Sequence, residues 1–132
     1  MLNVADQDTK RKVHKDIDVN INYLKDLLGV GESFDIIFRE YKVGRRRAAS
    51  FSINAMTNDV LLTNVLEEMM AVNQEELSLN TLQKLFYSRA VHSQVKMVDN
   101  ISDAVLSLLS GEMLFFLDRE DQVIVVDART YP

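Results

Sequence analysis

The chain has 132 residues, of which 47% are hydrophobic and 27% are charged, a balance typical of one globular domain. Its 20 acidic residues outnumber its 15 Lys and Arg residues, and the formal net charge of −5 argues against the broad basic face that general nucleic-acid binding needs. Cysteine is absent, which excludes disulfides, thiolate chemistry and cysteine-based zinc sites.

Residues 1–15 are polar and charged, and they lack the apolar core of a signal peptide. We expect them to form a flexible lead-in. No run of apolar residues in the chain approaches the length that crosses a bilayer. We therefore expect one globular domain that occupies residues 16–132.

The first regular element is a helix over residues 17–28. Asp16 or Asp18 can cap its start, and Gly29 can end it. Its apolar residues recur at helical spacing and predict one buried stripe: Ile17, Ile21, Leu24, Leu27 and Leu28.

Two strands, over residues 34–43 and 48–54, are predicted to form a hairpin around a short turn that contains Gly44. In the second strand apolar and polar residues alternate, which predicts one dry face and one polar face. In the first strand residues 36–38 are apolar on both faces. This pattern predicts that the first strand lies further inside the sheet than its partner.

The middle of the chain is predicted to contain two helices and an edge strand. The first helix begins at Thr57 or Asn58 and carries a wide apolar stripe as far as Met70, so it should be well buried. A shorter helix follows over residues 79–86. Polar and apolar residues then alternate over 94–98, as is typical of an edge strand.

The last part of the chain carries the clearest patterns. Apolar residues at helical spacing predict a helix over residues 100–110, which Gly111 ends. Two strands, over 113–117 and 123–126, flank the polar turn 118–121. Each strand is apolar at consecutive positions, so we expect both of its faces to be covered.

The predicted order of elements is αββααβαββ, which indicates an α/β fold of the α+β type. We expect a single domain, with a mixed sheet of about five strands and helices packed on it. A last strand that is apolar on both faces should lie deep in this sheet, yet the chain stops soon after it. This suggests a domain cut from a longer protein.

The sequence carries no catalytic or metal-binding pattern. His14 and His92 are its two histidines, and neither has partners at metal-ligand spacing. Asp127 and Arg129 could form an ion pair at the end of the last strand, but no second carboxylate is placed to work with Asp127 in acid–base chemistry. We expect no enzyme activity, no metal and no cofactor.

Basic residues gather at the predicted hairpin turn: Lys42, Arg45, Arg46 and Arg47. One interpretation is attraction to anionic lipid headgroups or to an acidic partner surface. The other is a solvated turn whose charges keep a sheet edge from aggregating. We favour the second interpretation, because four charges lie at the lower limit of a polybasic cluster.

Several segments resemble the N-terminal region of the GerA family of spore germination proteins, of the A-subunit type. The resemblance lies in the order and spacing of these segments, which are residues 23–29, 33–40, 109–117 and 126–132 (the last reading VDARTYP). Within the family, residues 85–95 with His92, and the ending Tyr131-Pro132, are similar to the stage V sporulation protein AF branch.

The resemblance implies that this chain is the first of two soluble subdomains that precede a membrane-embedded portion. It implies a place at the inner membrane of the spore, on the cytoplasmic (spore core) side, in an oligomeric ion-conducting complex. The implied partners are the second subdomain, the membrane portion, further copies and other germination proteins. Our main hypothesis is a non-enzymatic domain for assembly and coupling. Its expected contacts are the basic turn together with Asp127, Arg129 and Tyr131.

Two other classes of function stay open at this point. A sheet with helices packed on it often binds small molecules at its strand ends, so the chain could be a sensing domain for a germinant. The chain could also be a fragment of an enzyme whose site is completed elsewhere, with Asp127 and Arg129 as the residues to suspect.

Overall fold

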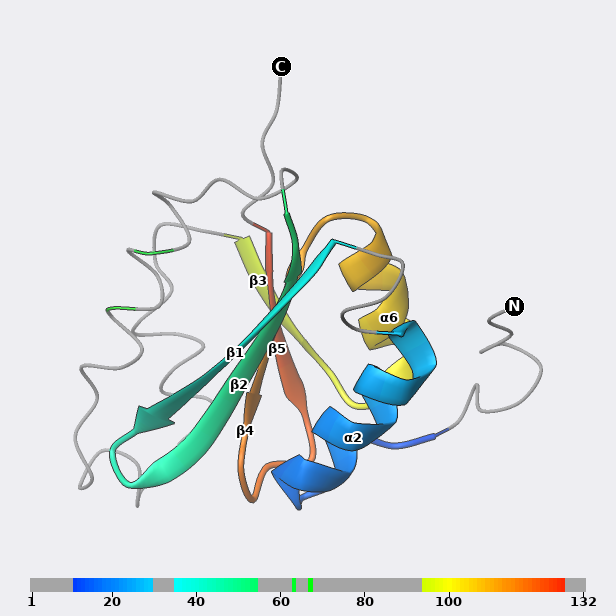
Figure 1. Ribbon diagram of the computed structural model, residues 1–132. Coiled ribbons are helices and arrows are strands. Elements are labelled where there is room, and N and C mark those ends of the chain that lie inside the picture. Colours follow the sequence, from blue (N-terminus) through cyan, green and yellow to red (C-terminus); the bar gives the residue numbers. More distant parts are fainter. Residues whose placement is uncertain (1–10, 30–34, 55–62, 64–66, 68–93, 128–132) are drawn as a thin grey trace.

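In the computed structural model, residues 11–29, 35–54, 63, 67 and 94–127 are described. This part of the chain forms a sheet with helices on it (Figure 1). Its elements are α2 (Ile17–Leu28), β1 (Ile36–Val43), β2 (Arg46–Ile53), β3 (Gln94–Val98), α6 (Ile101–Leu109), β4 (Met113–Leu117) and β5 (Val123–Asp127). The strands lie in the order β1-β2-β4-β5-β3.

Every hydrogen-bonded strand pair in the described residues is antiparallel. The prediction of a mixed sheet is therefore wrong, although the class, α+β, is right. The helical crossover through α6 does connect two strands that run in the same direction, β3 and β4. However, β5 lies between them and pairs antiparallel with both, so no parallel pair is formed. This is a split β-α-β arrangement.

The relative positions of β1 and β2 are the reverse of the prediction. β1 lies at the edge of the sheet, and β2 lies inside it between β1 and β4. The serines of β2 that suggested a polar outer face are buried, with Ser50 3% and Ser52 4% exposed. The Ser50 hydroxyl forms a 2.9 Å hydrogen bond with the Tyr41 hydroxyl. A bonded hydroxyl can be buried at low cost, so alternation of polar residues did not indicate exposure here.

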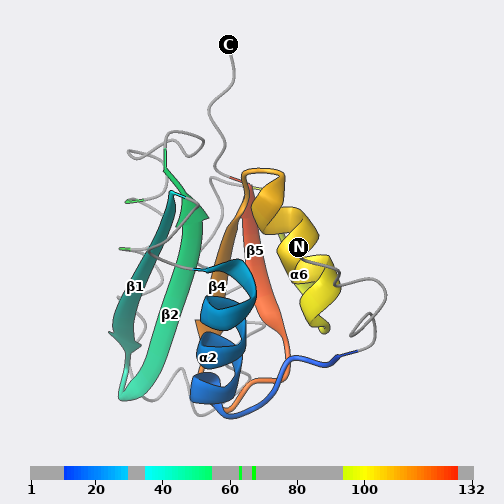
Figure 2. The same cartoon turned by 45° about the vertical axis from the view of Figure 1, so that its right-hand side comes forward.

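Helices α2 and α6 cover the same face of the sheet (Figure 2). Phe51 of β2 lies at the centre of this face, in an edge-to-face contact with Phe116 at 6.0 Å between ring centroids. Phe38 of β1 packs against the Phe51 ring, with 5.0 Å between the ring centroids. Full burial of a side chain of this size stabilises the fold by roughly 1.5–3 kcal/mol, so the layer between the helices and the sheet is a hydrophobic core.

The opposite face of the sheet is buried as well. Met113, Phe115 and Leu117 of β4 are 0–2% exposed, and Ile124 and Val126 of β5 are 0% exposed. This confirms the prediction that both faces of the closing strands are covered. The helices predicted near residues 57–70 and 79–86 lie outside the described residues, except that Thr63 and Glu67 have helical backbone and exposed side chains.

Helix α2 has the predicted boundaries, and α6 is one residue shorter at each end than the predicted 100–110. Asp16, rather than Asp18, caps α2 by accepting a 3.0 Å hydrogen bond from the Asp18 backbone N–H. Gly29 ends this helix with φ 60° and ψ 48°, in the left-handed region that glycine adopts without a steric cost. Asn100 caps α6, accepting from the Asp103 N–H at 2.9 Å.

The fold begins before the expected boundary at residue 16. Val13 is 3% exposed and belongs to the core, and its backbone N–H donates to the Asp99 carbonyl at 2.9 Å. Residues 11–15 are thus fixed to the start of α6, while residues 1–10 of the expected lead-in lie outside the described residues. His14 is exposed, and its Nδ1 accepts from the Asp16 backbone N–H at 2.9 Å, which is a local structural role.

Asn20 holds this N-terminal segment against α2. It is 3% exposed, and its amide oxygen accepts from the His14 N–H at 2.8 Å while its amide nitrogen donates to the His14 carbonyl at 2.7 Å. One buried side chain therefore satisfies both backbone groups of one residue. This explains why a polar residue interrupts the buried stripe of α2.

We expect Asn20→Ala to lower the free energy of unfolding by about 1–3 kcal/mol, because it leaves both backbone groups of His14 without their partners. Urea unfolding followed by circular dichroism measures the change. Asn22→Ala is the matched control, since Asn22 lies in the same helix with an exposed side chain. Equal stability of the two variants would contradict the role given to Asn20.

Candidate functional site

The residues predicted to form contacts are placed at two different ends of the sheet (Figure 1). The turn of the β1–β2 hairpin lies beside the β4–β5 turn, because Ala48 pairs with Leu117. Asp127 closes β5 at the opposite end, where it pairs with Gln94. Arg129 and Tyr131 lie outside the described residues. The described residues of the predicted set therefore lie on two separate surfaces, the hairpin turn and the end of β5.

The hairpin turn is tighter than predicted, since its strands extend to Val43 and from Arg46. Only Gly44 and Arg45 form the turn, and Gly44 has φ 63°. Glycine at the first position of a two-residue turn supplies the positive φ that joins tightly paired antiparallel strands. The four basic residues consequently lie at a short, well-paired end of the hairpin.

Arg46 folds back onto the β4–β5 turn. Its side chain is 16% exposed, and it forms a 3.0 Å ion pair with Glu120. The same terminal nitrogen donates to the Asp118 carbonyl, while the Nε of Arg46 is buried without a partner among the described residues. Arg46 is thus a structural residue that ties two turns together.

Asp118 collects further contacts at this end of the sheet. Its carboxylate accepts from the Ile17 backbone N–H at 3.1 Å, and its own N–H donates to the Arg47 carbonyl at 2.9 Å. The next residue, Arg119, has φ 73° and donates its N–H to the Lys15 carbonyl at 2.7 Å. The hairpin, the start of α2 and the β4–β5 turn therefore form one connected unit.

Arg47 lies between two carboxylates. It contacts Asp18 of α2 at 2.9 Å and Glu40 of β1 at 3.1 Å. All three side chains are about half exposed, between 42% and 56%, so solvent screens these pairs and each stabilises the fold only slightly. The contacts nevertheless hold the charge of Arg47 close to its own chain.

The Arg47 contact changes the titration of Asp18. The pKa of Asp18 is lowered, and its hydrogen bond with Arg47 is the largest cause. Desolvation acts in the opposite direction, and the positive charge of Arg47 lowers the pKa further. The same contact raises the pKa of Arg47. Because the folded pKa of Asp18 lies below its unfolded value, the contact stabilises the fold above the unfolded pKa. This contribution is lost as the pH falls through the folded pKa.

Lys42 and Arg45 differ from the two arginines that follow them. Both are exposed, and neither forms an ion pair with any described residue. Of the four basic residues at the tip, these two are the ones available to another molecule. We call Lys42 and Arg45 the hairpin tip.

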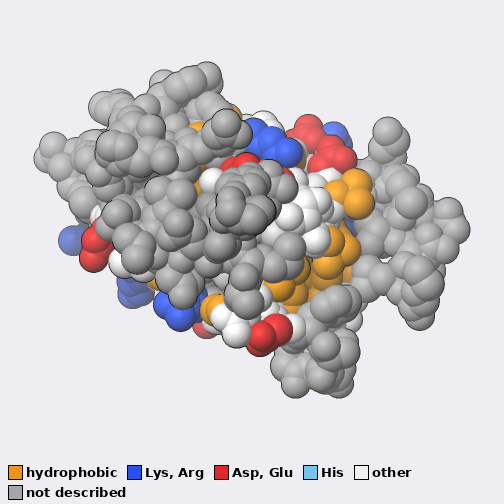
Figure 3. All heavy atoms as spheres, turned by 90° about the horizontal axis from the view of Figure 1, so that it is seen from above, with side chains coloured by type: hydrophobic (Ala, Val, Ile, Leu, Met, Phe, Trp, Pro, Cys, Tyr) orange, Lys and Arg blue, Asp and Glu red, His pale blue; other side chains and the backbone are white. Residues whose placement is uncertain are grey.

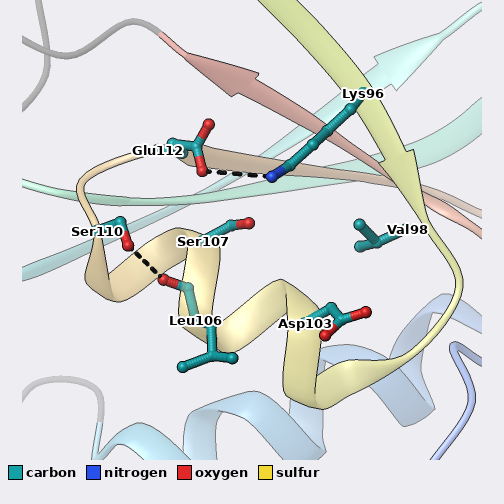
Figure 4. Close-up of a pocket in the computed structure, with 7 residues that line it drawn as sticks. All are labelled: Lys96, Val98, Asp103, Leu106, Ser107, Ser110 and Glu112. Atoms are coloured by element: carbon teal, nitrogen blue, oxygen red, sulfur yellow. Dashed lines mark hydrogen bonds and ion pairs between the residues drawn. The ribbon is translucent and has the colours of Figure 1, made fainter.

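A hollow of about 320 Å³ lies between β3 and α6, and no sequence pattern pointed to it (Figure 4). One signal was present: Leu106 falls outside the apolar stripe of α6, and it is 64% exposed. Leu109, which belongs to the predicted stripe, is 43% exposed. The residues that line this β3–α6 hollow are Lys96, Val98, Asp103, Leu106, Ser107, Ser110 and Glu112.

The end of the molecule seen from above shows hydrophobic side chains at the surface, flanked by acidic and basic ones (Figure 3).

Among the described residues there is no cluster of three or more His, Cys, Asp or Glu side chains that could hold a metal ion. Within the same residues, no helix is both long enough and apolar enough to span a membrane.

We expect Arg47→Gln to raise the pKa of Asp18 toward the ordinary value of an aspartate, because the variant loses the charge and weakens the hydrogen bond. NMR titration of the side-chain carboxyl carbons measures this directly. Arg45→Gln removes one positive charge from the same turn and should leave the pKa of Asp18 nearly unchanged. An equal rise in both variants would show that general charge, and not the contact, sets this pKa.

A family described as Bacillus/Clostridium GerA spore germination protein matches residues 22–132. Stage V sporulation protein AF of Bacillus subtilis (strain 168) is 21% identical over 126 residues, which are 96% of this chain and 26% of that protein. The chain thus spans about a quarter of the length of this relative.

A solved structure has a similar fold. It is the N-terminal domain of the A subunit of the Bacillus megaterium spore germinant receptor GerK3, with a TM-score of 0.75 and 22% identity. The match covers 91% of this chain and 49% of that domain structure. Since the family match extends over most of the chain, this protein belongs to the GerA family of Bacillus/Clostridium spore germination proteins.

Proposed function

We propose that this chain is the first of two subdomains in the soluble N-terminal region of a spore germination protein of the A-subunit type. Its function is assembly: it makes contacts between subunits and couples them to an ion-conducting complex in the inner spore membrane. The domain lies on the cytoplasmic side and has no catalytic activity. Its partners are the second subdomain and membrane portion of the same protein, further copies, and other germination proteins.

This proposal rests mainly on the fact that the chain aligns with only part of the GerK3 structure. Nine tenths of this chain match about half of an N-terminal domain, with a TM-score of 0.75. A chain that accounts for half of a domain structure fits one of two subdomains. The same chain matches only 26% of stage V sporulation protein AF, which leaves most of such a protein for a second subdomain and a membrane portion.

The geometry supports an assembly role more than a catalytic one. Arg46 and Arg47 are bound to their own chain, so we propose that the hairpin tip, Lys42 and Arg45, makes the contact with an acidic partner surface. Exposed charges at the rim of an interface act mainly on the rate of association and on orientation. We propose Asp127, with Arg129 and Tyr131, as a second contact toward the next subdomain.

A sensing domain for small molecules is the alternative, and the β3–α6 hollow is the feature that supports it. Its volume of about 320 Å³ lies at the lower end of the range for ligand sites. Such sites usually enclose most of their ligand, whereas this hollow is partly open to solvent. The assembly role is therefore favoured.

The assembly role is tested by reversing the charges of the hairpin tip in the full-length protein, as Lys42→Glu with Arg45→Glu. We expect a lower yield of cross-linked oligomers and germination slowed by about twofold or more, because the steering charges change sign. Oligomers are measured in spore membrane extracts, and germination by the fall in optical density.

Lys15→Glu with Arg39→Glu is the matched control. Both residues are exposed and form no ion pair in the described part of the chain, and the change in net charge is the same. The hairpin tip has no part in assembly if both double variants assemble and germinate like the original protein. It has no specific part if the control is impaired equally.

A further inference from the structure

We propose that the outer edge of β3, together with the β3–α6 hollow, binds an extended segment of a partner protein that carries a Lys or Arg side chain. The segment would add a strand beside β3 and place its basic side chain in the hollow. This inference rests on the proposed role in protein contacts, but it concerns a surface separate from the hairpin tip.

The first argument is the position of β3. It is the last strand of the sheet, and in the described residues only β5 pairs with it. Within the described part of the chain its other edge is unpaired, and an extended segment can pair with the backbone N–H and C=O groups there. Strand addition of this kind takes affinity from the main chain and specificity from pockets for alternate side chains.

The second argument is that a pocket lies on the correct side of this edge. Lys96 and Val98 project from β3 toward the face that α6 covers, and both line the hollow (Figure 4). Side chains of an added strand alternate in the same way. Every second side chain of the added segment would thus lie over the hollow.

The third argument is an unused hydroxyl. Ser107 is only 6% exposed, and its side chain points into the hollow from α6 (Figure 4). The Ser107 hydroxyl forms no hydrogen bond with any described residue. The Ser110 hydroxyl, in contrast, donates to the Leu106 carbonyl at 2.8 Å. The Ser107 oxygen is not a fully buried atom without a partner, so a ligand group in the hollow would take the place of water beside it.

The fourth argument is charge. Glu112 and Asp103 are acidic and Lys96 is basic, so the lining has a formal charge of −1 (+1 −2). The Glu112 side chain is only 14% exposed, yet its ion pair with Lys96 is long at 3.8 Å, and Lys96 is 57% exposed. A partly buried carboxylate with such a loose partner favours a second cation.

The apolar wall of the hollow favours a protein segment over a free amine. Leu106 is 64% exposed at the rim, and Val98 lines the opposite side. Lys and Arg side chains bury their methylene stems against such surfaces while the charged end reaches a polar group. The chemistry of the hollow thus matches a long basic side chain that enters from a backbone beside β3.

The probe is a blocked peptide, acetyl-Thr-Val-Thr-Lys-Thr-Val-Thr-amide, titrated into the 132-residue chain and followed by NMR. We expect shifts of the β3 and α6 amide signals with a dissociation constant below about 1 mM. Glu112→Gln should weaken binding by about tenfold, and Ser107→Ala should weaken it to a smaller extent. Asp121→Asn removes an exposed carboxylate that does not line the hollow and is the matched control.

Three outcomes overturn the inference. The first is the absence of binding at about 5 mM peptide. The second is equal binding of a peptide with Glu in place of Lys. The third is unchanged binding of a peptide whose backbone nitrogens facing β3 are N-methylated. Shifts that depend on protein concentration without peptide would assign the edge to a second copy, and equal shifts with free lysine would assign the hollow to a small amine. Either result replaces the proposed occupant. Failure here leaves the assembly role standing, since the hairpin tip tests that role.

Discussion

Burial of the β4–β5 hairpin on both faces is the constraint on which the rest of the fold depends. From Met113 to Leu117 and from Val123 to Val126, every side chain is 0–2% exposed. Strands in such surroundings must have their backbone groups paired on both edges, which requires β2 beside β4 and β3 beside β5. A register slip of one residue would exchange the residues of the two faces. The two core layers thus fix the alignment of the other strands.

The sequence predicts the elements that are determined by local pattern. The boundaries of α2, α6 and β3–β5 lie within one residue of those predicted from their apolar pattern, because spacing decides which residues face the core. It does not predict which hairpin strand is interior. The alternating pattern predicts that Ser50 and Ser52 are exposed, yet both are buried, and the Ser50 hydroxyl forms a hydrogen bond with the Tyr41 hydroxyl. The sheet is antiparallel because β5 inserts between β3 and β4, a pairing between distant segments that local pattern cannot encode.

The candidate surfaces were predictable only in part, for a similar reason. Basic residues at the hairpin turn are visible in the sequence, but the partners of Arg46 and Arg47 lie up to 74 positions away along the chain. Long-range contacts therefore divide one apparent cluster into structural and available charges. The β3–α6 hollow depends on the angle between a strand and a helix. Its one signal in the sequence was Leu106, an apolar residue outside the buried stripe of α6. The described residues thus form a tightly packed centre, with the hairpin tip and the β3–α6 hollow as candidate surfaces for contacts.

We expect this domain to act through contacts at the hairpin tip and not through chemistry in its core. Hydrogen exchange of the full-length protein, measured in its assembled state and as a dissociated subunit, tests the claim most directly. The account predicts that residues 42–45 gain protection on assembly while β4 and β5 remain equally protected in both states. Unchanged exchange at residues 42–45, in an oligomer verified to be intact, would contradict it.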